Sequence, residues 1–328
     1  MANENENTVE VDDTVVAQAP ASSDGALGVD LNEHAARIGR ADRVATGILT
    51  VIVAFVLMIL AAIVAFILIQ GLGKALTPGF LTTSPLADEN PGISSELFDS
   101  FYMLVITLLI SVPISLGAAI FLVEYAPDNW ITKAASTAIE TLSSLPSIVV
   151  GMFGSLFFVV TLGWGISIIA GAMALTMFNI PILVRVIQQA LEDVPRSQRD
   201  AGLAMGLTRW ETTIHVLLPA AMPAIVTGVV ISAGRVFGEA AALIFTSGSA
   251  AVNLNFASLN FASPRNPWNI FRPAETLAVH IWKLKTEPTP GNDEIVWGTA
   301  AVLLICVLLF NVIARLLGKF LAKKMTSE

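Results

Sequence analysis

The stretch that decides the fold is TLSSLPSIVVGMFGSLFFVVTLGWGISIIAGAMALTMFNIPILV, which runs from Thr141 to Val184 without one Asp, Glu, Lys or Arg. One helix crosses the hydrocarbon core of a bilayer with about 20 apolar residues, so this stretch is long enough for two helices. Gly163 and Gly165 lie near its middle and can supply a turn. The sequence therefore predicts two membrane-spanning helices, over residues 141–161 and 166–184, joined in a tight hairpin.

Four more uncharged stretches lie on either side of this hairpin, and each predicts one further transmembrane helix. A charged residue at the centre of such a helix costs about 2.5–3.5 kcal/mol on insertion scales, so the gaps between charges mark the spans. The predicted helices cover residues 46–70, 100–123, 221–245 and 295–314. With the hairpin they form a six-helix domain over residues 44–328, and we predict an all-α integral membrane protein.

The composition agrees with a membrane protein and excludes an ordinary soluble enzyme. Hydrophobic residues make up 55% of the 328 residues and charged residues only 13%, compared with about 25% charged in an average soluble domain. The formal net charge is -8, but residues 1–36 hold eight acidic residues and no Lys or Arg, so the rest of the chain is balanced. We predict that residues 1–43 form an acidic, disordered cytoplasmic tail, which is either regulatory or merely solubilising.

The distribution of basic residues predicts the orientation in the membrane. With the amino terminus in the cytoplasm, the inner side collects twelve Lys and Arg residues near the spans and the outer side five. Because cytoplasmic loops carry an excess of positive residues, both termini are expected to be cytoplasmic. The chain is thus predicted to be a multi-pass protein of the cytoplasmic membrane, surrounded by lipid.

The inner connection over residues 185–220 has more content than a simple loop. It places apolar residues at helical spacings, with Pro195 as an interruption and Gly206 as a candidate turn. This pattern predicts short helices on the cytoplasmic face. On the pattern alone, these helices either present a surface to a partner or anchor the bundle at the membrane interface.

Within this connection, the segment RDAGLAMGLTRWETTIHVLLP, from Arg199 to Pro219, resembles the cytoplasmic loop of permease subunits of ATP-binding-cassette (ABC) importers. The positions that fit the pattern of that loop are Asp200, Ala201, Gly202, Gly206, Val216, Leu218 and Pro219. The sequence departs from the pattern by Asp for Glu, Gly for the second Ala and Val for Ile. The resemblance implies a MetI-like permease fold and a coupling helix, within about residues 193–207, that fits into a groove of a cytoplasmic ATPase.

Immediately downstream, Gly234, Arg235, Val236, Phe237, Gly238 and Glu239 resemble the Gly-Arg, two residues, Gly-Glu pattern of phosphate-specific permeases. The segment FRPAETLAVHIWK, over residues 271–283, favours the PstA family over its sister PstC. Membership would imply a PstC-like sister permease as heterodimer partner, two copies of a PstB-like ATPase that uses ATP-Mg, and an extracytoplasmic PstS-like phosphate-binding protein. No nucleic acid is expected as a partner.

Arg235 and Glu239 are also informative without the resemblance, because they lie in the predicted fifth span. Residues four apart share one face of a helix and can pair. Ionisable groups inside a membrane face protein or a water-filled path. The pair is therefore either a self-neutralising ion pair that fixes helix packing or part of a path for an anion, and the resemblance favours phosphate.

Several kinds of chemistry are missing from the sequence. There is no Gly-x-x-x-x-Gly-Lys-Ser/Thr loop for nucleotide hydrolysis. His34, His215 and His280 fall in three different compartments of the predicted topology, so we expect them to form no metal site together. We predict no catalytic residue and no cofactor in this chain, which is expected to be a transport subunit and not an enzyme.

Other functions stay open at this stage. The nearest alternatives are the sister PstC-type subunit and an importer permease for another anion. An ion-coupled secondary transporter would be expected to show internal repeats with matching broken helices. A membrane signalling subunit that recruits a regulator through residues 185–220 would have no need for Arg235 and Glu239.

Overall fold

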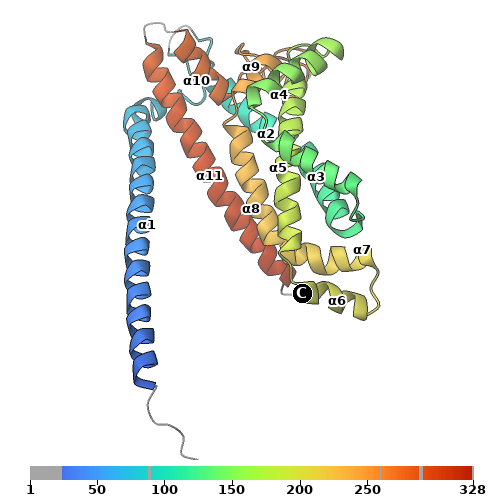
Figure 1. The fold of residues 1–328 in the computed structure, drawn as a ribbon. Coiled ribbons are helices and arrows are strands. Elements are labelled where there is room, and N and C mark those ends of the chain that lie inside the picture. The colour runs from blue at the N-terminus through green and yellow to red at the C-terminus, as the bar shows by residue number, and fades with distance from the viewer. Residues whose placement is uncertain (1–23, 88–89, 259, 288–290, 327–328) are drawn as a thin grey trace, which may run out of the picture. The chain divides into compact units, whose positions relative to one another are not determined.

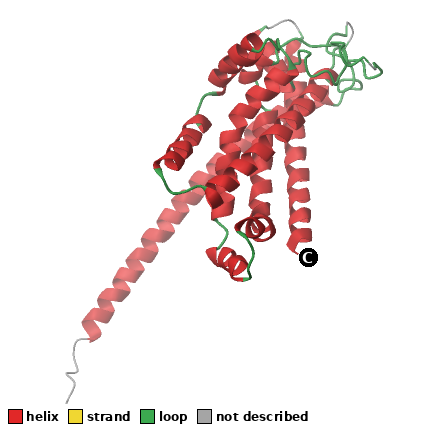
Figure 2. Cartoon of the chain, turned by 90° about the vertical axis from the view of Figure 1, so that its right-hand side faces the viewer, coloured by secondary structure: helices red, strands yellow, loops and turns green. Residues whose placement is uncertain are grey.

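The computed structural model describes residues 24–87, 90–258, 260–287 and 291–326, in which all regular structure is helical and no β-strand occurs (Figures 1 and 2). In chain order the elements are α1 (Asp24–Ala75), α2 (Ser94–Ile120), the π-helical turn η1 (Phe121–Tyr125), α3 (Trp130–Ser143), α4 (Ser147–Gly154), η2 (Ser155–Thr161), α5 (Ile168–Glu192), α6 (Arg196–Ala204), α7 (Arg209–Thr212), η3 (Thr213–Leu217), α8 (Leu218–Phe237), α9 (Ala241–Thr246), α10 (Leu277–Thr286) and α11 (Asn292–Thr326).

Five helical segments in the described part are long and apolar enough to cross a membrane. They are Asp42–Ala75, Ser94–Tyr125, Ile168–Glu192, Arg209–Phe237 and Asn292–Leu316. A sixth crossing is present if the bent pair of α3 with α4 and η2 counts as one span. The predicted all-α membrane fold is confirmed, with five or six crossings.

The predicted span over residues 141–161 is not one continuous helix, and the break lies at Pro146 and Ser147, which the sequence marks as a kink or a break. α3 ends at Ser143 and α4 begins at Ser147, and the two segments are bent by 100° at this break. Pro146 lies at the break as the N-terminal cap residue of α4, with an extended backbone (ψ 134°). Proline has no N–H for a helical hydrogen bond and disfavours helical geometry in the residue before it, so the helix cannot run straight through.

The predicted turn of the hairpin is confirmed. Gly163 and Gly165 have φ angles of +68° and +67°, in the left-handed region that glycine adopts without steric cost. α5 then begins at Ile168, where the side chain of Ser167 accepts a hydrogen bond from the backbone N–H of Ala170. α5 continues to Glu192, beyond the predicted end at residue 184.

The fifth span was also predicted with the wrong bounds, at 221–245. Helical structure begins at Arg209 and continues through α7, η3 and α8, then stops at Phe237. The wider π-helical turn η3 precedes Pro219, whose ring and missing N–H disfavour tight α geometry at that point. Residues 209–220, predicted as part of the inner connection, therefore belong to the same helical rod as the span.

The predicted disorder of residues 1–43 is wrong over residues 24–43, because α1 begins at Asp24. Residues 1–23 lie outside the described part. Adding a residue to an existing helix fixes fewer new dihedral angles per hydrogen bond than starting one, so a long apolar helix can extend into a polar segment. The chain divides into two compact units, residues 1–63 and 64–328, and α1 contributes to both.

The core of the second unit is built around α5, which packs against α2, α3, α4, α8 and α9. Two clusters of buried apolar side chains result. One includes Leu175 and Phe237, and the other includes Ile187 and Ile225. α6 and α7 lie at the opposite end of α5 and α8 from α9 and α10 (Figure 1).

Replacing Gly228 by Ala should destabilise this core by about 1–3 kcal/mol. A β-carbon at residue 228 of α8 would lie 2.0 Å from Cγ1 of Val186 on α5, and valine is stiff at χ1 in a helix. Denaturation of the detergent-solubilised protein with SDS, followed by circular dichroism, measures the change. Adding Val186→Ala should recover stability. Gly117→Ala, where a β-carbon meets no atom within 4 Å, is the control; an equal loss there would contradict this explanation.

Candidate functional site

Arg235 lies in the last turn of α8, inside a candidate membrane span, yet it is exposed in the isolated chain. Its guanidinium group lies over the ring of Phe178 on α5, with 4.2 Å between the guanidinium carbon and the ring centroid. This cation–π contact holds the planar group against one face of the bundle. An arginine exposed to lipid costs at least about 2.5 kcal/mol, so this face requires either another protein chain or a water-filled path.

Glu239 does not pair with Arg235 in the described part of the chain, which contradicts the alternative of a self-neutralising ion pair. α8 ends at Phe237 with Gly238 as its C-terminal cap residue, which removes Glu239 from the helix face of Arg235. The ion pairs between described residues include none between these two side chains. Instead, Oε1 of Glu239 accepts a hydrogen bond of 3.3 Å from the backbone N–H of Ala242 in the first turn of α9.

The absence of an ion pair between Arg235 and Glu239 determines the electrostatics of the site. Within the described residues, no carboxylate neutralises Arg235. Glu239 is partly buried and is held by the start of the next helix. The planar fork of N–H donors on Arg235 is therefore available to an anionic group from outside this chain.

A buried polar triad supports the position of Arg235. The side-chain amide of Asn179 on α5 donates a hydrogen bond of 3.0 Å to Oγ of Ser111 on α2, and the hydroxyl of Ser232 on α8 donates to Oδ1 of Asn179. All three side chains are buried. Asn179 follows Phe178 directly and Ser232 lies almost one turn before Arg235, so the triad fixes the two helices that form the cation–π contact.

The predicted coupling segment contains a real helix. α6 spans Arg196–Ala204, and Gly206 follows it with a φ angle of +86°, which turns the chain towards α7. Asp200 and Ala201 are exposed on α6. Leu218 and Pro219, which the resemblance grouped with these residues, lie apart from them at the start of α8 and are partly buried.

Gly202, a departure from the expected Ala, has a packing reason. It is the one buried residue of α6. A β-carbon there would lie 2.8 Å from Cγ2 of Thr212 on α7. The absence of a β-carbon at Gly202 therefore allows α6 to pack closely against Thr212 of α7, although glycine has a lower helix propensity than alanine.

An ion pair that no sequence pattern predicts joins α6 to η1 at the end of α2. Nη2 of Arg199 donates to Oε1 of Glu124 in η1, whose side chain is only 7% exposed. The pair borders a cavity that is also lined by Leu203 on α6 and by Arg209 and Thr212 on α7. The two partners are 75 residues apart in the sequence, so no local pattern indicates them.

Comparisons with known proteins agree with this arrangement. The family model described as "Binding-protein-dependent transport system inner membrane component" matches residues 111–327. The probable ABC transporter permease protein YqgI of Bacillus subtilis is 48% identical over 88% of this chain and 98% of its own length. The phosphate transport system permease protein PstA of Yersinia pestis is 30% identical over 72% of this chain and 75% of its own length.

The fold is also similar to a solved structure. One chain of a bacterial ABC transporter involved in the import of the acidic polysaccharide alginate covers 86% of this chain and 98% of its own length, with a TM-score of 0.53 and 14% identity. The matched family segment contains α5, the predicted coupling segment and Arg235. This chain belongs to the binding-protein-dependent transport system inner membrane components, the multi-pass permease subunits of ABC importers.

Proposed function

We propose that this chain is the PstA-type permease subunit of an ATP-driven importer of inorganic phosphate. The observation that carries the proposal is Arg235, a cation without a carboxylate partner that is exposed on the membrane span α8. In the proposed complex a PstC-like sister permease covers this face, and the two permeases enclose the path for the anion.

The chemistry of Arg235 suits a tetrahedral oxyanion. A guanidinium group presents parallel N–H donors that bind two phosphate oxygens at once, and such charge-assisted hydrogen bonds are the strong ones. Phe178 keeps the plane of the group fixed. Glu239 holds the start of α9 nearby, and its remaining oxygen can accept the proton of a protonated phosphate.

The relatives support phosphate without excluding a second anion. PstA proteins of Yersinia pestis and Mycobacterium tuberculosis, each 30% identical, are phosphate transport system permeases. The name of the more similar YqgI protein states a probable ABC transporter permease and no substrate. An importer permease for another oxyanion is therefore the second candidate, and it uses the same Arg235 chemistry.

Reconstitution tests the proposed substrate. Proteoliposomes that hold this chain, its sister permease, the ATPase and the binding protein should accumulate labelled phosphate only with ATP and only when this chain is present. Unlabelled phosphate should abolish the signal and a similar concentration of sulfate should not. Uptake that sulfate suppresses equally well, or that persists without this chain, would contradict the proposal.

We further propose that α6 is the coupling helix that contacts the ATPase. Met205, directly after α6, is 84% exposed, and Leu203 is 42% exposed. Exposed apolar side chains on a short helix favour docking against another protein. In this arrangement both chain termini and α6 lie on the cytoplasmic side, where two copies of the ATPase consume ATP-Mg, and the binding protein docks on the opposite side.

Met205→Cys should form a cross-link to a cysteine placed in the docking groove of the ATPase. The background variant Cys306→Ser removes the native thiol, and Thr286→Cys, at the end of α10 on the opposite end of the bundle, is the matched control. The adduct should form with Met205→Cys and not with Thr286→Cys. The absence of an adduct under every nucleotide condition would count against the coupling role.

A further inference from the structure

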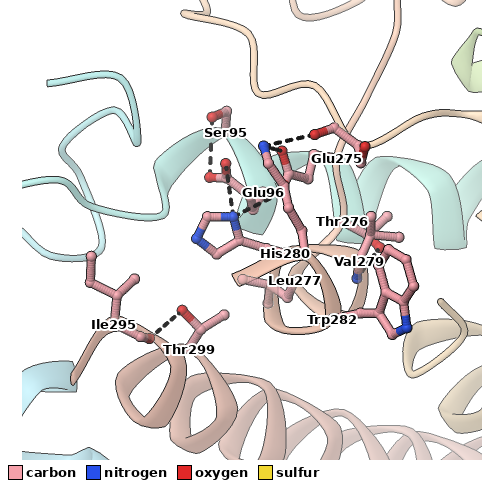
Figure 3. A network of polar contacts seen from close by, with 12 residues as sticks. Ser95, Glu96, Glu275, Thr276, Leu277, Val279, His280, Trp282, Ile295 and Thr299 are labelled. Carbon is pink, nitrogen blue, oxygen red and sulfur yellow. Dashed lines mark hydrogen bonds and ion pairs between the residues drawn. The ribbon is translucent and has the colours of Figure 1, made fainter. Parts of the chain in front are cut away.

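Three ionisable side chains from different segments converge at the start of α2 (Figure 3). Glu96 comes from the first turn of α2, Glu275 from the segment before α10, and His280 from α10 itself. Their exposed fractions are 0%, 1% and 6%. Nδ1 of His280 lies 2.9 Å from Oε1 of Glu275 and 3.8 Å from Oε1 of Glu96, and the three ligand atoms lie within 4.8 Å of one another.

The second carboxylate oxygen of each glutamate in this cluster accepts a hydrogen bond from a group outside the cluster. Oε2 of Glu96 accepts a hydrogen bond from the hydroxyl of Ser95, and Oε2 of Glu275 accepts one from the ammonium group of Lys283. That ammonium group also donates to the backbone oxygen of Ser249, so it points away from the centre. Oε1 of Glu96 has no hydrogen-bond partner although it is buried. A buried carboxylate oxygen without a partner is costly, and it faces the other two ligand atoms.

We propose that Glu96, Glu275 and His280 form a divalent metal site that binds Zn²⁺. Carboxylate oxygens and a histidine nitrogen are zinc ligands, and bonds of about 2.0–2.1 Å in a tetrahedral site separate ligand atoms by about 3.4 Å. The two observed separations from Nδ1, 2.9 Å and 3.8 Å, lie on either side of that value. Three protein ligands leave the fourth position for water.

The charges favour a cation at this place. Two carboxylates and one ammonium group leave a net negative charge among groups that are largely removed from water, and such a charge needs a counterion. A proton on Nδ1 of His280 adds no charge unless Nε2 is protonated as well, and Nε2 is buried without a hydrogen-bond partner among the described residues. The 2.9 Å contact also directs the Nδ1 proton to Glu275 and leaves Oε1 of Glu96 unpaired. A metal ion at the centre satisfies all three ligand atoms at once.

Zinc binding by the purified full-length chain in detergent tests this proposal. The protein is stripped with a chelator and titrated with Zn²⁺ by calorimetry, and the bound metal is counted by mass spectrometry after gel filtration. We expect one zinc per chain. Co²⁺ in the same site should show the visible absorption bands of four-coordinate cobalt. The measurement on the wild type is enough to overturn the proposal. If the wild-type chain retains no zinc, the cluster of Glu96, Glu275 and His280 is not a metal site.

Variants then assign the ligands. His280→Gln and Glu96→Gln should each weaken zinc binding by about 100-fold or more, since even residues that only support a ligand contribute 10- to 100-fold. His215→Gln alters an exposed histidine whose Nδ1 contacts the backbone oxygen of Glu211, far along the chain from the cluster, and this variant should bind zinc like the wild type. Zinc binding that is unchanged in both ligand variants would place the metal elsewhere and overturn the proposal.

Discussion

Arg235→Gln should lower ATP-dependent phosphate uptake by about 100-fold in the complete transporter. The substitution keeps most of the side-chain volume and removes the charge and the paired donors. A hydrogen bond to a charged group contributes about 1.5–3 kcal/mol. If the guanidinium group of Arg235 makes two such bonds to the anion, its removal takes away most of the affinity of the transport path for that anion. Initial rates of labelled phosphate uptake in proteoliposomes, at several phosphate concentrations, measure the loss.

Two controls separate this role from a structural one. Arg235→Lys keeps the positive charge but not the planar fork of parallel N–H donors, so it cannot bind two phosphate oxygens at once. This variant should therefore show more uptake than Arg235→Gln and less than the wild type. Arg185→Gln removes another arginine, on α5, whose 3.2 Å ion pair with Glu140 is exposed. Exposed ion pairs contribute little, so this variant should transport normally. Normal uptake by Arg235→Gln, in a complex that assembles with its partners, would refute the role of Arg235.

The apolar character of the spans and their approximate number, six predicted against five or six found, could be predicted from the sequence because the cost of charge in a bilayer is large and local. The turn at Gly163 and Gly165 was predictable for a similar reason, since few residues adopt their backbone geometry. Helix breaks were harder to place. Pro146 bends one span by 100°, whereas Pro181 lies inside α5 without ending it. The same residue type has different effects, because packing around the helix decides whether a break is tolerated.

The sequence singles out Arg235 and Glu239 as candidate site residues, but their contacts differ from the expected ones. The pairing of Arg235 with Glu239 assumed a helix that continues through Gly238, and the end of α8 at Phe237 removes that assumption. The cation–π contact with Phe178 joins two helices that are far apart in the sequence. Long-range pairs of this kind depend on how the helices pack, and a single sequence contains no local pattern for them.

The strongest example of such a long-range pair is the contact between Asp99 and Arg272, and its loss should have the largest effect on stability. The two residues are 173 positions apart, and their side chains are 1% and 0% exposed. Nη1 of Arg272 donates to Oδ2 of Asp99 at 3.1 Å, and Nη2 donates to Oδ1. The guanidinium group also donates to the backbone oxygens of Pro267 and Pro273. The pair thus fastens the segment before α10 to the first turns of α2.

Asp99→Asn should reduce the free energy of unfolding by about 3–5 kcal/mol, because it leaves a buried guanidinium group without its counterion. SDS denaturation of the purified protein measures the change. Asp128→Asn is the matched control, since the 3.1 Å contact of Asp128 with Lys133 involves side chains that are 87% and 73% exposed, and it should leave stability unchanged. Equal stability of the Asp99 and Asp128 variants would contradict this prediction.

A double variant separates the cost of an unpaired charge from the value of the pair itself. Apolar residues in place of both members of a buried ion pair are often tolerated, because no charge is then left in the interior. Asp99→Val with Arg272→Met should therefore be more stable than Asp99→Asn alone. The recovery should be incomplete, because the backbone oxygens of Pro267 and Pro273 lose their donor. If the double variant is less stable than the single one, the two positions act by packing and not as a charge pair.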